Sequence, residues 1–220
     1  MSSRRPHSTG SDKVLRVDAK SPSPRAIAQA AEVIARGGVV VFPTSGLYGL
    51  AADARNSTAV NRLFDLKQRP DHMPILVLVR NREGLKGLVK TIPAAAERIM
   101  ERLWPGGITI VFPARADLAP GLTAGGGKIG IRVAAHPVAR ALVEEFGSPV
   151  TATSANLSGG PGCARIDRLA PRIERDVELI LDAGPLSGGV GSTVIDVTGE
   201  TWHVLREGAV SVRDIAAALG

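Results

Sequence analysis

The chain has 220 residues, of which 44% are hydrophobic and 22% are charged. This length fits one globular domain with a core of ordinary size. Aromatic residues make up only 3%, so we expect an aliphatic core, and the single cysteine, Cys163, excludes an intramolecular disulfide. The net charge of +6 favours anionic partners, either phosphates or nucleic acid.

The hydropathy of the chain and its N-terminal residues indicate the compartment in which we expect the protein. No run of eighteen apolar residues is present, and the first thirteen residues lack the apolar segment of a signal peptide. We therefore expect a soluble cytoplasmic protein that does not contact a membrane. Residues 1–20 are rich in Ser and basic residues and are predicted to form a flexible basic tail, followed by a single domain over residues 21–220.

The predicted elements of the first half alternate between strands and helices. Residues 14–17 could form a short edge strand. Ser23 and Pro24 then suit the start of a helix whose body spans residues 27–36. The unbroken apolar run at residues 39–42 predicts a buried strand. Ser57 is expected to cap a second helix that continues to Lys67, and a buried strand is predicted at 75–79.

The second half continues the same alternation. Helices are predicted at residues 93–103 and 137–146, and Ser211 is expected to cap a final helix. Further strands are predicted at residues 108–112, 129–133, 150–153, 177–181, 193–197 and 202–205. This order lacks strict βαβ regularity, so we expect an α/β fold with a twisted, open, mixed sheet and flanking helices.

Two segments after predicted elements carry polar or basic residues, and ligands of α/β folds gather at strand ends. Residues 43–50, PTSGLYGL, follow a buried strand with small residues that allow close approach of a ligand. The segment Lys67-Gln68-Arg69-Pro70 ends a helix. If Pro70 breaks the helix, Lys67 and Arg69 can point the same way. An ordinary turn and helix-end cations remain alternative interpretations of these segments.

Hydroxyl groups and further cations complete a candidate anion site. Residues 150–162, VTATSANLSGGPG, offer hydroxyls and backbone N–H groups that can cradle phosphate, although no P-loop pattern is present. Arg132 and Arg206 lie on predicted strands among apolar neighbours, so each must point outward or meet an anion. Lys128 would share the strand face of Arg132.

The sequence lacks the motifs of metal-binding and covalently catalysing enzymes. The four histidines are scattered without metal-ligand spacing, Cys163 has no obvious basic partner, and neither GxSxG nor HExxH occurs. Covalent catalysis and a protein-held zinc ion are therefore disfavoured. Cations together with hydroxyls suit the positioning of phosphates and the stabilisation of developing negative charge.

Seven sequence blocks, taken in order, resemble the YrdC-like threonylcarbamoyl-AMP synthase family. The resemblance runs from about Ser23 to Val212 and ends without a C-terminal extension, as in the short, single-domain form. The blocks are GGVVVFPTSGLYGL, LKQRPDHMPILVLV, LWPGGITIVF, KIGIRVAAHP, TATSANLSG, STVID and VLREGAV.

The resemblance implies a fold, a reaction and partners. The expected fold is a YrdC-like twisted open sheet with a large positively charged cavity. The expected nucleotidyltransferase reaction joins L-threonine, bicarbonate and ATP, accompanied by Mg²⁺, into threonylcarbamoyl-AMP and pyrophosphate. This product serves threonylcarbamoyladenosine modification of tRNA by a transferase complex.

The resemblance also implies residue roles. Lys67 and Arg69 would be catalytic. The residues expected to bind ATP are Lys67, Arg69, Lys128, Ser154, Asn156 and Arg206, with Lys128 replacing a family threonine. Those expected to bind L-threonine are Thr44, Tyr48, Arg132, Ala152 and Ser192, with Arg132 pairing with the carboxylate.

Departures from the family motif leave alternatives open. Ser45, Gly46 and Leu47 replace the usual (D/E)TV in the first block, so Gly46 removes a hydroxyl expected to contact threonine. Met73, Leu78 and Gly162 replace polar family residues. The chain could therefore be a paralogue with another acceptor or weak synthase activity. A different alternative is an RNA-binding module for tRNA or double-stranded RNA, although interleaved aromatic residues are few.

Overall fold

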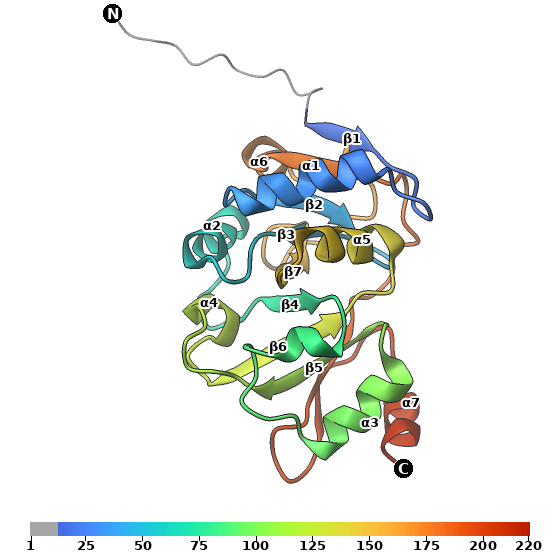
Figure 1. The fold of residues 1–220 in the computed structure, drawn as a ribbon. Coiled ribbons are helices and arrows are strands. Elements are labelled where there is room, and N and C mark those ends of the chain that lie inside the picture. The colour runs from blue at the N-terminus through green and yellow to red at the C-terminus, as the bar shows by residue number, and fades with distance from the viewer. Residues whose placement is uncertain (1–12) are drawn as a thin grey trace, which may run out of the picture.

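The computed structural model describes residues 13–220, and within them ten strands form one mixed sheet (Figure 1). The strand order is β1-β8-β2-β3-β7-β4-β6-β5-β9-β10. The strands are β1 (Val14–Arg16), β2 (Val40–Pro43), β3 (Tyr48–Ala51), β4 (Leu76–Val79), β5 (Ile108–Pro113), β6 (Lys128–Val133), β7 (Val150–Ser154), β8 (Leu179–Asp182), β9 (Thr193–Asp196) and β10 (His203–Arg206). The predicted open mixed sheet is thus confirmed.

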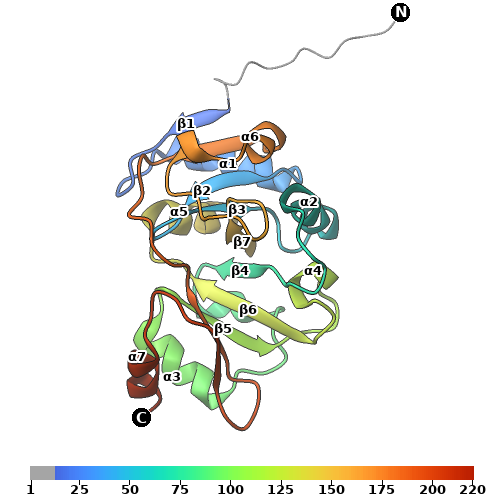
Figure 2. The ribbon, with the colours of Figure 1, turned by 180° about the vertical axis from the view of Figure 1, so that it is seen from behind.

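The helices lie against both faces of this sheet and at its ends (Figures 1 and 2). They are α1 (Pro24–Ala35), α2 (Ser57–Lys67), α3 (Ala94–Leu103), α4 (Pro120–Thr123), α5 (Pro137–Phe146), α6 (Pro171–Asp176) and α7 (Val212–Leu219), with 3₁₀ turns at Arg82–Leu85 and Ile166–Arg168. Helices α1 and α5 pack on one face, whereas α3 and α7 lie together beside the C-terminus (Figure 1).

Side-chain alternation along the buried strands divides the apolar core in two. In β2, Val40 and Phe42 join the cluster beneath α1 and α5, whereas Val41 faces the larger cluster on the opposite side. All three side chains are fully buried. Because successive residues of a strand point to opposite faces, a continuous apolar run is what a strand covered on both sides requires.

Strand β7 joins the two halves of the sheet, which matters for the site. It pairs antiparallel with β3 through Thr153 and Ser154, and antiparallel with β4 through Val150, Thr151 and Ala152. Strands β3 and β4 lie on opposite edges of β7, and the pairing with β4 stops at Ala152, so Thr153 and Ser154 are paired on the β3 edge alone. Polar residues can occupy this end because the strand ladder no longer covers them on both sides.

Most predicted elements are present, but four details differ. Residues 48–51, expected within a loop, form β3, because their backbone pairs with both β2 and β7. Helices α4 and α6 were not predicted. Asn56, rather than Ser57, caps α2, since its side chain accepts a hydrogen bond from the Ala59 N–H. The expected cap of the last helix is confirmed, because Ser211 accepts from the Asp214 N–H.

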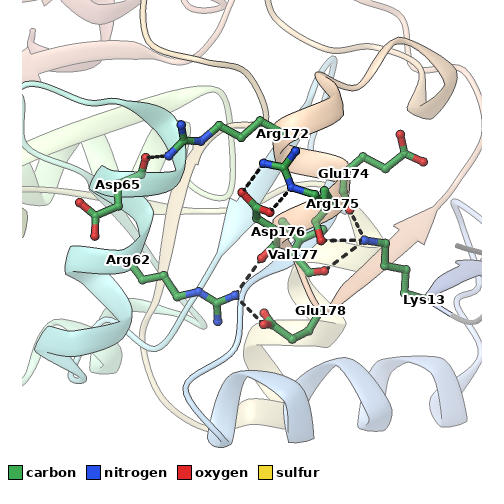
Figure 3. Close-up of polar contacts among 9 residues, drawn as sticks. All are labelled: Lys13, Arg62, Asp65, Arg172, Glu174, Arg175, Asp176, Val177 and Glu178. Atoms are coloured by element: carbon green, nitrogen blue, oxygen red, sulfur yellow. Dashed lines mark hydrogen bonds and ion pairs between the residues drawn. The ribbon is translucent and has the colours of Figure 1, made fainter. Parts of the chain in front are cut away.

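The expected basic tail overlaps the sheet. Within residues 1–20, Val14–Arg16 form β1, which pairs parallel with β8, so this part belongs to the fold. Lys13 donates to the carbonyls of Glu174, Arg175 and Val177 at the end of α6 (Figure 3). These bonds stabilise a helix end whose carbonyls lack intrahelical partners. The rest of the predicted tail, residues 1–12, lies outside the described residues.

A second set of contacts fixes α6 against α2. The Arg62 guanidinium donates to the Asp176 carbonyl at 2.8 Å and to the Glu178 carboxylate at 2.5 Å, and Arg172 donates to the Asp65 carbonyl at 2.9 Å (Figure 3). These bonds hold the last turns of both helices in place. Across residues 13–220, every helix is too short or too polar to cross a bilayer.

Candidate functional site

A cavity of about 290 Å³ opens where β2, β3, β6 and β7 end, beneath the segment that connects β8 to β9. Its volume is near the lower end of the range for small-molecule sites. Four cationic side chains line it, and its described lining contains no carboxylate. These four are Lys67, Arg69, Arg132 and Arg206. The arrangement favours an anionic ligand, because like charges held together need a counter-charge.

Arg132, on β6, is the cavity arginine whose guanidinium donors are all unused among residues 13–220. It is half-buried, and among residues 13–220 its guanidinium forms no hydrogen bond or ion pair. Burial, with a smaller contribution from the Arg206 cation, lowers the pKa of Arg132 to about 10, so the side chain remains charged at neutral pH. A planar, unpaired guanidinium in this position suits a carboxylate or phosphate.

Arg69 reaches the cavity from the turn after α2. Gln68 adopts a left-handed conformation, with φ of 50°, and ends the helix one residue after Lys67. The Arg69 guanidinium donates from Nε to the Met73 carbonyl at 2.8 Å and from Nη2 to the Pro74 carbonyl at 2.9 Å. These bonds leave its remaining donors available. Lys67 and Arg69 thus line one cavity, as the sequence predicted for a helix broken here.

Arg206 approaches from β10, at the edge of the sheet. Its Nε and Nη2 donate to the Ser192 carbonyl at 3.2 and 2.7 Å, and Nη2 also lies 3.3 Å from Ser192 Oγ. Ser192 is itself buried and shares a 2.8 Å hydrogen bond with Thr109 Oγ1. Ser192 therefore orients Arg206, while the guanidinium keeps further donors for a ligand.

The turn after β7 supplies the hydroxyl-rich wall. Ser154 Oγ donates to Asn156 Oδ1, and Asn156 Nδ2 donates to the Gly160 carbonyl. Lys67 Nζ donates to the carbonyls of Ser154 and Asn156 at 2.5 and 2.6 Å, and to Asn156 Oδ1 at 3.2 Å. The side chains of Asn156 and Lys67 are thus bonded within the wall itself.

The first predicted site segment, residues 43–50, forms the opposite wall. Thr44 Oγ1 donates to the Leu47 carbonyl at 2.6 Å, which closes the turn between β2 and β3. The fully buried Tyr48 donates from its hydroxyl to the Gly184 carbonyl at 2.7 Å and accepts from the Ala183 N–H. Burial raises the pKa of Tyr48, so this hydroxyl stays protonated. Both residues line the cavity while their hydroxyls hold the backbone.

Residues 183–192, which we call the strap, connect β8 to β9 over this wall. The Gly188 N–H donates to the Gly46 carbonyl at 2.9 Å. A Cβ atom added to Gly46 would lie 2.2 Å from the Gly188 carbonyl oxygen. The strap can approach this closely only because position 46 has no side chain. Val190, in the strap, lines the cavity and is 67% exposed.

Of the eleven predicted site residues, Lys128 alone is absent from the cavity lining. Its ammonium lies 2.7 Å from Asp196 Oδ2 on β9. Lys128 stands four residues before Arg132 on β6, which corresponds to about 13 Å along a strand. A shared strand face therefore does not bring the two cations together. The remaining predicted residue, Ala152, lines the cavity from β7, where it pairs with Leu76.

The structure adds lining residues to which the sequence assigned no binding role. Ser158 belongs to the cavity wall, and its buried Oγ has no hydrogen-bond partner among residues 13–220. Met73 is 41% exposed at the cavity. Ser158 lay within the segment noticed in the sequence, but only the tertiary structure distinguishes its free hydroxyl from the bonded hydroxyl of Ser154.

The profile of the family described as Sua5/yciO/yrdC, telomere recombination, matches residues 32–208. A Bacillus subtilis protein named threonylcarbamoyl-AMP synthase is 38% identical over 195 residues, which cover 88% of this chain and 56% of that protein. This chain thus spans about half the length of that relative. A Mycobacterium tuberculosis protein named putative threonylcarbamoyl-AMP synthase is also 38% identical, and 90% of its length is covered.

Solved structures share the fold. P. abyssi Sua5 complexed with L-threonine superposes with a TM-score of 0.89 and 35% identity, covering 94% of this chain and 61% of that one. E. coli YciO superposes with a TM-score of 0.83 and 30% identity, covering 92% of this chain and 98% of that one.

Proposed function

We propose, since the chain belongs to the Sua5/YciO/YrdC family, that it makes threonylcarbamoyl-AMP and pyrophosphate from L-threonine, bicarbonate and ATP. One observation carries the proposal: arginines from three separate elements converge on a cavity whose described lining has no carboxylate. The names of the relatives and the L-threonine in the P. abyssi Sua5 structure support both the adenylate product and the amino acid.

The chemistry fits a site made of cations and hydroxyls. The threonine amine forms a C–N bond with bicarbonate and water is lost, which gives a carbamate. A carbamate oxygen then attacks the α-phosphorus of ATP, and the bond to the β-phosphate oxygen breaks as pyrophosphate leaves. The attacking oxygen is already anionic, so this second step needs no side chain to remove a proton. The enzyme's task is then to hold anions together and to stabilise negative charge.

Each arginine has a distinct part in this proposal. Arg132, the unpaired cation, would pair with the threonine carboxylate in a bidentate geometry. Arg69 and Arg206 would use their remaining donors on the phosphates as pyrophosphate leaves. Ser158 would donate a hydroxyl hydrogen bond from the facing wall, where Ser154 Oγ, already bonded to Asn156, would serve as an acceptor.

Magnesium enters this proposal as part of the substrate MgATP. Mg²⁺ in proteins is held by one or two carboxylates plus substrate phosphates. The described cavity lining offers hydroxyl and carbonyl oxygens but no carboxylate. The residues therefore fit a metal brought by the phosphates and do not fit a resident metal site.

Pyrophosphate release tests the function. Arg69→Ala should lower ATP-dependent release with threonine and bicarbonate by about a hundredfold, the usual loss for one preorganised contact. Arg25→Ala, on the exposed face of α1, is the matched control and should leave the rate unchanged. Full activity of Arg69→Ala would count against the assignment.

The acceptor amino acid is a separate question, because Gly46 and the strap shape that wall in this chain. Release measured across a panel of amino acids separates threonine from another acceptor, and equal rates for all of them would contradict threonine specificity. We further propose that the product serves tRNA modification through a transferase complex.

A further inference from the structure

The ammonium of Lys67 is enclosed by the protein itself. Lys67 is 1% exposed, and its three N–H donors meet the Ser154 carbonyl, the Asn156 carbonyl and Asn156 Oδ1. An ammonium group has three donors, so none is left for a ligand. Among residues 13–220, no carboxylate pairs with this cation.

The backbone of the same residue holds the next part of the turn. The Ser158 N–H donates to the Lys67 carbonyl at 2.9 Å. Lys67 therefore bonds to both ends of residues 154–158. Its ammonium donates to Ser154 and Asn156, and its carbonyl accepts from the Ser158 N–H. Ser158 Oγ is left without a partner at the cavity, although the atom is buried.

We propose that Lys67 is a positioning residue, whose ammonium holds the turn of residues 154–158 so that Ser154 and Ser158 face the nucleotide. In this role it contacts no substrate, unlike Arg69, which keeps free donors in the same cavity. This inference rests on the proposed function for the identity of the ligand. Its structural part, the dependence of the turn on Lys67, can be tested without any ligand.

The charge of Lys67 is sensitive to pH near neutrality. Burial, with a smaller contribution from the Arg69 cation, lowers the pKa of Lys67 to about 7. The other charged groups around the cavity are also cations: Arg132 on β6 and Arg206 on β10. At the same end of α2, Arg172 approaches from α6. If opening of the turn exposes Lys67, the lysine returns to its ordinary pKa of about 10 and the open form binds more protons, so the closed turn should become more stable as pH rises above about 7.

Hydrogen exchange of the ligand-free protein is the first test. Lys67→Met should accelerate amide exchange in residues 155–160 by tenfold or more. Lys13→Met is the matched control, because Lys13 also donates to three backbone carbonyls, at the end of α6 (Figure 3). It should leave exchange in residues 155–160 unchanged. Unchanged exchange in Lys67→Met would overturn the proposal.

Binding of MgATP by calorimetry is the second test. Ser154→Ala and Lys67→Met should each weaken binding about tenfold, and the double variant should be no weaker than Lys67→Met alone, because the turn is already released. Additive losses would show that Lys67 contacts the nucleotide itself, which would overturn the proposal. If the wild-type chain binds no ATP while the exchange results hold, the proposed function fails and the positioning role stands.

A third test measures the wild-type chain. Exchange in residues 155–160, corrected for the intrinsic effect of pH, should fall between pH 7 and 9, because opening of the turn exposes a lysine that keeps its proton to about pH 10. The free energy of unfolding should rise with pH over the same range for the same reason. Lys67→Arg keeps its charge in this range and should remove both changes. Exchange in residues 155–160 of the wild-type chain that does not respond to pH would contradict the proposal.

Discussion

Arg132 is a side chain whose charge is unfavourable for the fold while its donors remain available to a ligand. Its guanidinium is half-buried and unpaired among the described residues, and burial together with Arg206 disfavours its charge. Anion binding would supply the missing partner. The buried charge of Arg132 thus lowers the stability of the ligand-free protein, and an anionic ligand would offset this loss.

The first prediction concerns this cost. Arg132→Met should raise the free energy of unfolding by on the order of 1–3 kcal/mol, because it removes an uncompensated buried charge. The same change should lower kcat/KM for threonine by about a hundredfold. Urea denaturation and pyrophosphate release measure the two effects. Arg206 makes two bonds to the Ser192 carbonyl, so Arg206→Met should lower both stability and activity, and serves as the comparison.

Asp196 gives a second prediction at the residue scale. Burial raises its pKa, but hydrogen bonds from Lys128 and Thr198 outweigh burial, so the pKa is lowered overall. A lowered pKa stabilises the fold above the unfolded value of about 3.9, and this stability is lost as pH falls through the folded value. Lys128→Met should therefore reduce the acid dependence of unfolding below about pH 4, by less than about 1 kcal/mol because the lysine of the pair is half-exposed. The catalytic rate should not change. A large drop in that rate would indicate that Lys128 contacts the nucleotide.

At the scale of elements, the strap and the turn between β2 and β3 depend on each other. Gly46→Ala would place its Cβ 2.2 Å from the Gly188 carbonyl oxygen, so the strap must move. We expect a loss of about 1–3 kcal/mol in stability, typical of overpacking, and a KM for threonine raised more than the KM for ATP. Gly199→Ala is the control, because its Cβ would lie 3.6 Å from the nearest atom, the Thr201 carbonyl oxygen. Equal changes in both KM values would contradict a local effect of the strap.

At the scale of the whole molecule, the cavity is shared between the two halves of the sheet. Arg69 and the turn after β7 form one side, whereas Arg132 and Arg206 belong to the half that contains β6 and β10. A ligand that bridges them stabilises the folded state as a unit. MgATP at a hundred times its Kd should add about 2.7 kcal/mol, or roughly 5–10 °C in melting temperature for a chain of this size.

Thermal melting checks this prediction and separates the RNA alternative. The shift should appear with MgATP and be reduced in Arg69→Ala. An RNA-binding module would instead show no shift with ATP, and its RNA affinity would fall steeply as salt rises. That combination of results would contradict the synthase proposal.

The sequence by itself determined the buried strands, because an uninterrupted apolar run such as residues 39–42 can be satisfied only between two covered faces. It also determined where two elements end, the helix before Pro70 and the strand before the polar turn that follows β7. Strand β3 escaped prediction, because its pairing partners β2 and β7 lie about a hundred residues apart and short, Gly-containing segments carry little periodicity.

Only the tertiary structure decided which of the polar residues face a ligand. Lys67, Arg69 and Arg132 cannot be told apart as cations in the sequence. Within the described residues, however, Lys67 donates all its side-chain hydrogen bonds to the protein, Arg69 donates some and Arg132 donates none. Lys128 shares a strand face with Arg132 but pairs with Asp196 beyond the cavity lining. The physical reason is that the groups that accept hydrogen bonds from these cations lie far away in the sequence. Which donors stay free for a ligand is therefore decided only when the chain folds.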